Sequence, residues 1–402
     1  MKARTVHLPW YFKGIREVER QLDRTNVKIL SAMWKYGPRN LLEVSRRIEI
    51  PFTTVYHRVS KLETASGRLA YLVPRTSRMG MVRVVFLAAA NPGCEGLLTD
   101  ALKVPNLWRS INTCEGPFTQ LSVHTVPVQF LKDFKIYAQR LLQLGVVKRY
   151  RLIRTGDHVT TFPNFRYYDQ SSKQWAFQWK RWLTRLREAK PGEELVDPEE
   201  YPMLADGKDL LIVKELEKNA RTSFADLAPV LGISLQGVKY HYDKRLVPSG
   251  IIQYFAFDVY PHPVEVSAYH ESMLEFTSKE AMNRFFSLRG ELFFVHGVAK
   301  VLGRNELIVR TYTPGSELRD MFTFFSEMAK ADMLASYSSV RLDFAGREAQ
   351  TISYELFDEH RGWVLDPKRC LLALSDLAGK KNVPALRPRD PRRGGSDDRT
   401  TR

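Results

Sequence analysis

Cysteine is scarce in this 402-residue chain, and its scarcity argues against two common ways of stabilising a small domain. The three cysteines, Cys94, Cys114 and Cys370, are odd in number and far apart, so they favour neither a disulfide framework nor a zinc site. Long apolar runs are also missing, because none approaches the roughly 18 residues that a membrane helix needs. The basic segment 1–6 is not followed by the apolar core of a signal peptide. We therefore expect a cytoplasmic protein with no membrane partner.

The motifs of several large enzyme classes are absent as well. The sequence contains no phosphate-binding loop, no Gly-x-Ser-x-Gly nucleophile motif and no His-Glu-x-x-His zinc motif. Its histidines and cysteines do not fall at metal-ligand spacing. On these grounds we expect a protein that is not an enzyme, with no catalytic residues, no cofactor and no bound metal.

The chain is rich in apolar side chains and in positive charge. A hydrophobic fraction of 44% and an aromatic fraction of 11% are typical of packed globular domains rather than of a disordered chain. Lysine and arginine number 61 against 45 aspartates and glutamates, which gives a formal net charge of +16. Such an excess favours an anionic partner, with nucleic acid first and an anionic membrane second.

The sequence also repeats itself. Segment 23–30 (Asp-Arg-Thr-Asn-Val-Lys-Ile-Leu) matches segment 206–213 (Asp-Gly-Lys-Asp-Leu-Leu-Ile-Val), which lies 183 residues later. The same offset still holds at Gly67 and Gly250, and segment 168–175 matches 357–363 at an offset of 188 or 189. A repeat of this length indicates two fused copies of one unit.

The first third of each unit has the spacing of three short helices. In the first unit, Ile29, Leu30 and Met33 form one buried stripe, and that helix ends at Gly37. The buried stripes of the second and third helices comprise Leu41, Val44 and Ile48, and then Val55, Val59 and Leu62. After Gly67, segments 69–73 and 81–87 predict a hairpin with its turn at 74–78, which completes a winged helix-turn-helix.

The outward face of the third helix predicts the contacts to DNA, because such a helix suits the major groove. The predicted contacts in the first unit are Thr53, Thr54, Tyr56, His57, Arg58 and Lys61 on the helix, with Arg75 and Arg78 near the tip of the hairpin. Arg58 lies at the edge of the buried face, so it is either a phosphate contact or a salt-bridge residue. The second unit offers Gln236, Lys239, Tyr240 and Lys244.

The rest of each unit predicts an α/β domain. Residues 82–153 have the pattern strand, helix, strand, strand, helix and strand, which is the βαββαβ order of the ferredoxin-like fold, and residues 266–344 repeat it. The predicted fold class is therefore α+β, a winged helix-turn-helix plus a ferredoxin-like domain, duplicated in tandem. The expected segments are a winged helix-turn-helix at 20–80, a ferredoxin-like domain at 81–183, a Pro-rich linker at 184–204, a second winged helix-turn-helix at 205–263, a second ferredoxin-like domain at 264–375 and a disordered basic tail at 376–402.

These features resemble the Lrp/AsnC family of transcriptional regulators, here as two tandem copies. The residues that carry the resemblance are Leu22-Asp23, Ile29-Leu30, Thr54-Val55, Arg58-Val59, Leu62 and Gly67, with Ser234, Val238 and Gly250 in the second unit. Pro51 stands where the family usually has serine, and one residue is inserted before Gly67. The resemblance implies binding to double-stranded DNA, and often a small-molecule effector such as an amino acid. The glycine in loop 113–117 either makes a turn or contacts that effector.

The resemblance also implies that the α/β domains pair. In a fused chain they would form an intramolecular pseudo-dimer, and further self-association stays open. The two helix-turn-helix segments differ in charge, because residues 23–80 hold 11 basic and 4 acidic side chains whereas residues 206–263 hold seven of each. Phosphate neutralisation supplies most nonspecific affinity, so the first unit is predicted to be the dominant DNA reader.

The sequence thus predicts a sequence-specific, DNA-binding transcriptional regulator. Two alternatives remain open. One is a non-enzymatic module whose winged helices contact protein or RNA. The other is a tetrapyrrole-modifying enzyme of the related AsnC-like siroheme decarboxylase type, although no catalytic signature of such enzymes is matched in this sequence.

Overall fold

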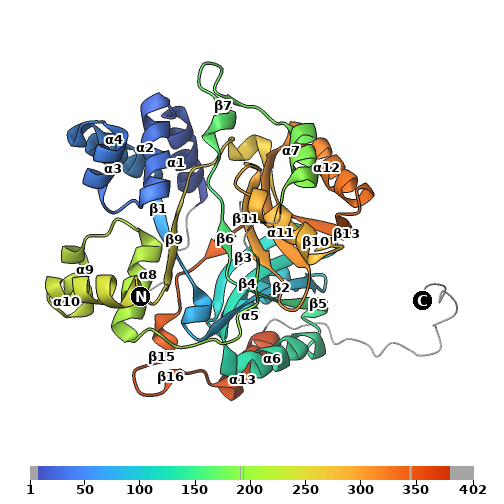
Figure 1. The fold of residues 1–402 in the computed structure, drawn as a ribbon. Helices are drawn as coiled ribbons and strands as arrows, with labels where there is room; N and C mark the ends of the chain where they lie inside the picture. The colour runs from blue at the N-terminus through green and yellow to red at the C-terminus, as the bar shows by residue number, and fades with distance from the viewer. Residues whose placement is uncertain (1–7, 191, 193, 344–345, 381–402) are drawn as a thin grey trace.

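The computed structural model describes residues 8–190, 192, 194–343 and 346–380. Two helical lobes lie on one side of the molecule, and two sheets with covering helices lie on the other (Figure 1). Each lobe is the first third of one copy of the sequence repeat. The predicted α+β class, with a winged helix-turn-helix and a ferredoxin-like domain duplicated in tandem, is confirmed.

The first lobe is built from helices whose ends are set by capping residues. It contains α1 (Leu8–Arg20), α2 (Arg24–Tyr36), α3 (Leu41–Ile48) and α4 (Phe52–Ser66). The side chains of Asp23 and Asn40 accept from free backbone N–H groups at the starts of α2 and α3. Gly67 ends α4 with a φ of 71°, a conformation that favours glycine. Helix α1 lies outside the predicted boundaries, and its Gly14 packs closely on the backbone of Ser66.

The second lobe repeats the first and touches it. It contains α8 (Gly207–Lys218), α9 (Phe224–Leu231) and α10 (Leu235–Tyr240), which continues as a π-helical turn, η4 (His241–Leu246). Arg39 donates to the carbonyl of Thr222, and Arg221 donates to the carbonyl of Pro38. Residues 38 and 39 correspond to 221 and 222 in the repeat, so the same patch meets itself, as in a two-fold dimer.

The predicted wing hairpin is wrong. Strand β1 (Ala70–Pro74) pairs antiparallel with β9 (Ile252–Phe257) of the other copy, so the two lobes share one two-stranded sheet. The segment expected to return as the second hairpin strand belongs instead to a long sheet strand, β2 (Met81–Ala90). Arg75 and Arg78 therefore do not lie at a wing tip. Arg75 precedes a short turn, η1 (Thr76–Arg78), and Arg78 is its last residue. The Asp157 carboxylate fixes this turn by accepting from Thr76 and Ser77.

The βαββαβ order predicted for each α/β domain is confirmed. The first domain contains β2, α5 (Glu95–Lys103), β3 (Trp108–Glu115), β4 (Gln120–Pro127), α6 (Leu131–Gln143) and β5 (Val147–Thr155). The second contains β10 (Ser267–Phe276), α11 (Lys279–Leu288), β11 (Val295–Lys300), β12 (Glu306–Pro314), α12 (Leu318–Lys330) and β13 (Leu334–Leu342). The strand orders are β5-β2-β4-β3 and β13-β10-β12-β11.

The two sheets join at both edges and enclose a shared interior. At one edge β13 pairs with β3, where Leu342 lies opposite Cys114. At the other edge Thr155 bridges to Val301. In the repeat, Thr155 corresponds to Leu342 and Val301 corresponds to Cys114, so the second edge repeats the first with the two copies exchanged. Short strands extend these edges, because β6 (Val159–Thr160) pairs with β11 and β14 (Glu348–Ala349) pairs with β3. The α/β domains therefore pair within one chain.

The end of each copy crosses over to the other copy. Helix α7 (Trp179–Glu188) packs on α11 and α12 of the second domain, whereas α13 (Pro367–Lys380) packs on α5 and α6 of the first (Figure 1). Each helix follows a small hairpin; the strands are β7 (Tyr168–Asp169), β8 (Gln174–Trp175), β15 (Phe357–Asp358) and β16 (Gly362–Trp363). Such exchange buries the last helix of one copy against the sheet domain of the other.

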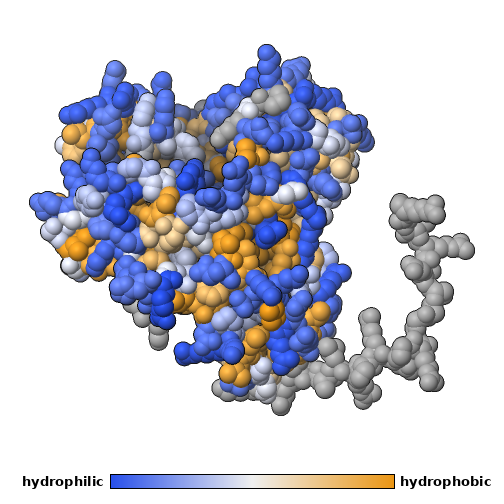
Figure 2. Space-filling model, turned by 60° about the horizontal axis from the view of Figure 1, so that its bottom comes forward, coloured by the Kyte–Doolittle hydropathy of each residue, from blue (hydrophilic) through white to orange (hydrophobic). Residues whose placement is uncertain are grey.

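The predicted disordered tail begins too early. Helix α13 runs past residue 376 to Lys380 because Leu374 and Ala378 are buried, and residues 381–402 lie outside the described chain. Figure 2 brings the lower side of Figure 1 forward and shows apolar patches between charged ones; Leu142 of α6 and Leu372 of α13 are among the exposed apolar residues. Within the described ranges, no helix is both long enough and apolar enough to span a bilayer.

Candidate active site

Helix α4 presents the face that the sequence predicts. Val55, Val59 and Leu62 are fully buried, as expected. The exposed side chains are Thr53, Tyr56, His57 and Lys61, with Thr54 half-buried. Arg58 donates to the Asp23 carboxylate at 2.6 Å and to Asn26, so of its two predicted roles the structure favours the salt bridge. Whether the exposed residues contact DNA stays a prediction.

The second lobe holds its recognition helix in the same way. The predicted contacts Gln236, Lys239, Tyr240 and Lys244 are all exposed. His241 Nδ1 lies 2.8 Å from Asp209, and Arg245 contacts both Asp209 and Asp206. In the repeat, Asp206, Asp209 and His241 correspond to Asp23, Asn26 and Arg58 at the 183-residue offset.

The same residues have the spacing of a metal site. Asp206, Asp209 and His241 are the one group in the described chain whose ligand atoms could surround an ion. The guanidinium of Arg245 already occupies the space between the two carboxylates and supplies the positive charge. We therefore explain this group as the link that fixes the recognition helix to α8.

A polar cluster that the sequence reasoning missed lies between the two sheets. We call Arg83, His158, Glu271, His296 and Arg310 the inter-sheet cluster. They come from β2, the β5–β6 loop, β10, β11 and β12, and their strand neighbours on the same face are apolar. Arg83 and Glu271 are buried, and the other three are partly buried.

The cluster holds more positive than negative charge. Arg310 Nε donates to the Glu271 carboxylate at 2.7 Å, but its Nη2 has no hydrogen-bond partner in the described chain. The Arg83 guanidinium donates to Thr155 Oγ1 at 2.9 Å, and no carboxylate of the described residues pairs with it. A buried cation without a counter-charge costs several kcal/mol. Such groups persist mainly where function requires them.

Two imidazoles lie beside these guanidiniums. His296 stacks on Tyr260 with ring centroids 5.0 Å apart, its Nδ1 lies 3.5 Å from the Tyr269 hydroxyl, and its Nε2 has no partner within the described ranges. His158 lies directly against β11, where a side chain at Gly297 would collide with its ring. Both histidines are therefore held in place by neighbouring strands.

The environment keeps both imidazoles neutral. Burial, with the nearby Arg310 guanidinium, lowers the pKa of His296 to about 3. Burial, with Arg83 and Arg310, lowers the pKa of His158 well below its ordinary value. Burial also lowers the pKa of Arg83 to about 10, although the Glu271 carboxylate opposes the shift. The arrangement therefore combines cations that bind carboxylates with imidazoles that can take up and release protons.

A sequence signal for the cluster exists. Arg83 interrupts the apolar run of β2, and Arg310 interrupts that of β12. Charged residues on the buried face of a strand are unusual unless they are paired or functional. The sequence could not show that the two strands face each other across one interior.

Two cavities open elsewhere on the molecule. One of about 480 Å³ is lined in part by Glu115, Gly116, His270 and Arg341, at the loop where an effector contact was one of two expectations. The effector itself stays a prediction. The other, of about 750 Å³, lies beside α7.

The comparisons with known proteins agree with this architecture. A family model described as a winged helix-turn-helix DNA-binding domain matches residues 206–253, so a domain of that type is present in the second lobe. The siroheme decarboxylase NirDL has a similar structure, with a TM-score of 0.50 at 12% identity, over 88% of this chain and 98% of that chain. At this identity the likeness shows a shared fold.

Transcriptional regulators match over less of the chain. An AsnC family regulator from Agrobacterium tumefaciens is 15% identical with a TM-score of 0.26, over 33% of this chain and 89% of that chain. The regulator NMB0573 from Neisseria meningitidis, solved with L-Met, is 17% identical with a TM-score of 0.28, over 33% of this chain and 88% of that chain. No curated protein matches this chain by sequence.

The expectation that the chain is not an enzyme is contradicted by the full-length likeness. The tandem architecture from which a regulator was inferred is, in NirDL, the architecture of an enzyme. Missing motifs of hydrolases and zinc enzymes could not exclude chemistry that needs only buried arginines, histidines and tyrosines. The two winged-helix lobes over a closed double sheet are thus the shared frame of this chain and a decarboxylase.

Proposed function

We propose that this chain is a decarboxylase that acts on a tetrapyrrole with several carboxylate side chains, of the siroheme type. The proposal rests on the inter-sheet cluster, where one of two guanidiniums pairs with a carboxylate and the other does not, beside two neutral imidazoles. The fold shared with NirDL suggests the class of substrate. We place the active site between the two sheets.

Arg83 and Arg310 are suited to hold the substrate carboxylates. A guanidinium binds a carboxylate through two parallel hydrogen bonds. Arg83 lacks a carboxylate partner among the described residues, and Arg310 Nη2 lacks any partner there. A substrate with several carboxylates supplies the missing negative charge, in surroundings where charges interact more strongly than in water.

His158 and His296 are suited to handle the proton. A neighbouring negative charge raises the pKa of a histidine, because it favours the charged imidazolium. In the free protein burial and the guanidiniums keep both rings neutral. A bound carboxylate offsets the guanidinium charge, so substrate binding itself moves an imidazole toward the protonated form that can donate.

The proposed step balances without an added oxidant. The bond between the carboxylate carbon and the rest of the substrate breaks, CO₂ leaves, and the electron pair remains on the substrate carbon. A proton from an imidazolium then forms the new C–H bond, and solvent returns a proton to the ring. Arg83 and Arg310 hold other carboxylates of the substrate, which keeps the reacting carboxylate beside the imidazoles until CO₂ leaves.

The direct test is turnover by the full chain. The purified protein is incubated with siroheme without oxygen, and mass spectrometry counts the carboxyl groups lost as CO₂. Stepwise loss supports the proposal. Siroheme that binds, as followed by its absorption spectrum, but keeps all its carboxyl groups would contradict it.

DNA binding by the first lobe is a second candidate function, and an enzyme can combine the two. It is favoured by the exposed polar face of α4, with Thr53, His57 and Lys61, in a segment whose basic side chains outnumber the acidic ones. Titration with duplex DNA at about 50 and 200 mM salt tests it, because neutralising several phosphates predicts a loss of roughly tenfold or more. An absent or salt-independent interaction counts against it.

A further inference from the structure

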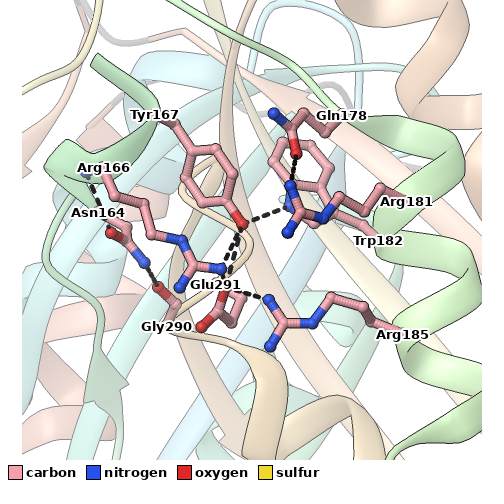
Figure 3. A network of polar contacts seen from close by, with 9 residues as sticks. All are labelled: Asn164, Arg166, Tyr167, Gln178, Arg181, Trp182, Arg185, Gly290 and Glu291. Carbon is pink, nitrogen blue, oxygen red and sulfur yellow. Dashed lines mark hydrogen bonds and ion pairs between the residues drawn. The ribbon is translucent and has the colours of Figure 1, made fainter.

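A cavity of about 750 Å³ on the outer side of α7 is rich in arginine. We call it the arginine pocket; its lining comprises Arg166, Tyr167, Gln178, Arg181, Thr184, Arg185 and Glu188. Figure 3 shows the guanidiniums of Arg166, Arg181 and Arg185 reaching toward one region from the turn before β7 and from α7. Its volume lies within the roughly 300–1,000 Å³ of small-molecule sites. Its lining shares no residue with the inter-sheet cluster.

The guanidiniums are held in position before any ligand arrives. One oxygen of Glu291 accepts from Arg185 at 2.7 Å, from the Tyr167 hydroxyl at 3.0 Å, and from Arg166 (Figure 3). The Tyr167 oxygen in turn accepts from the indole of Trp182 at 3.2 Å. Because Glu291 engages a single edge of each guanidinium, further N–H donors remain for an incoming anion.

Arg181 carries the charge that this network leaves over. It is exposed and donates to Gln178 at 3.1 Å, and no carboxylate in the described chain pairs with it. The pocket thus holds three arginines against Glu188 in its wall and Glu291 beneath it. Because the cations are already held in position, the entropic cost of binding a ligand is lower.

The other copy of the repeat lacks two of the three arginines. The turn at 165–167 corresponds to 354–356, so Glu355 stands in place of Arg166. Along the final helix the 188-residue offset places Ala373 at the position of Arg185 and Arg369 at that of Arg181. Both copies fold alike, so the fold does not require Arg166 or Arg185.

We propose that the arginine pocket binds a small polyanion that carries at least two carboxylate or phosphate groups. The forked guanidinium matches either group, since both present two oxygens in one plane. The preformed Glu291 network fixes where the anionic groups sit, and Arg181 provides the charge that an anion neutralises. This site does not depend on the proposed decarboxylation.

Calorimetric titration of the full chain with citrate and, separately, with pyrophosphate tests the proposal and tells carboxylate from phosphate. Saturable binding of either probe is expected. Arg181→Ala should weaken it about tenfold or more, and Arg181→Lys should weaken it less because the charge remains. Arg369→Ala is the matched control, since it removes the equivalent exposed arginine of the other copy, and it should leave binding unchanged.

Two results would overturn the proposal. One is that neither probe gives a saturable isotherm with the wild-type chain. The other is that Arg181→Ala and Arg369→Ala lose the same amount, because that would reflect general surface charge. Arg181 is exposed and makes one side-chain hydrogen bond, so loss of folding is not expected to confuse the result, and a thermal melt of each variant checks it.

Discussion

Acidification should destabilise this protein steeply, because five of its histidines are held neutral. Burial, the first cause in each case, lowers the pKa values of His124, His158, His262, His270 and His296; His124 and His296 reach about 3, and His262 and His270 about 4. In the unfolded chain these groups titrate near 6.5. The unfolded state therefore binds more protons below pH 6.5, so the free energy of unfolding falls as the pH is lowered from that value.

The size of the effect follows from the shifts. At pH 5 each histidine that stays neutral in the native state and protonates on unfolding costs about 2 kcal/mol, so the four with pKa values of about 3 or 4 together cost about 8 kcal/mol. Total stabilities of domains are about 5–15 kcal/mol, so unfolding near pH 5 is expected. The loss should stop growing near pH 3 to 4, where the native histidines protonate as well.

Urea denaturation at pH 7.5, 6.5 and about 5.5 measures the loss. Each buried histidine should contribute about 1.4 kcal/mol at the lowest of these values. His124→Asn should reduce the pH dependence by that amount, since the His124 ring lies 4.9 Å from Phe134 in an apolar setting and hydrogen-bonds to Ser122. Equal stabilities at pH 7.5 and 5.5, or an unchanged slope in the variant, would refute the reasoning.

The remaining predictions concern single positions. Arg83→Met should raise the free energy of unfolding by about 1–2 kcal/mol in urea denaturation. The pKa shift of Arg83 to about 10 corresponds to a penalty of about 3 kcal/mol for burying its charge, and the lost hydrogen bond offsets part of the gain. The same variant should lose turnover in the decarboxylation assay. Gly297→Ala should cost about 1–3 kcal/mol because its methyl group meets His158, which a lower urea midpoint would reveal. In DNA titrations, Lys61→Ala should lower affinity more than Lys239→Ala, and the reverse order would place the DNA reader in the second lobe.

Local periodicity was sufficient for the helices and the sheet domains. Val55, Val59 and Leu62 recur at helical spacing, and their burial follows directly. The predicted wing hairpin was wrong because it paired two segments that are neighbours in sequence, whereas strand β1 pairs with β9 of the other copy. The positions of helices α7 and α13 could not be predicted for the same reason, since each helix covers the domain of the other copy.

The candidate site could not be predicted because its members are far apart in the sequence. Arg83 and His158 come from the first copy, whereas Glu271, His296 and Arg310 come from the second. Only closure of the two sheets at both edges brings them together. The absence of known motifs therefore said nothing about this interior, and the polar interruptions in two apolar strands were its one local signal.

The measurement that tests the central claim most directly compares two histidine variants in the siroheme assay. His296→Asn alters the inter-sheet cluster, whereas His124→Asn alters a histidine of similar pKa and lower exposure in β4 that contacts Phe134 of α6. With both variants shown to be folded by thermal melting, we expect loss of CO₂ release in His296→Asn by about 100-fold, within the range for a lost acid–base group, and near wild-type release in His124→Asn. Equal release by the two variants would contradict an active site between the sheets.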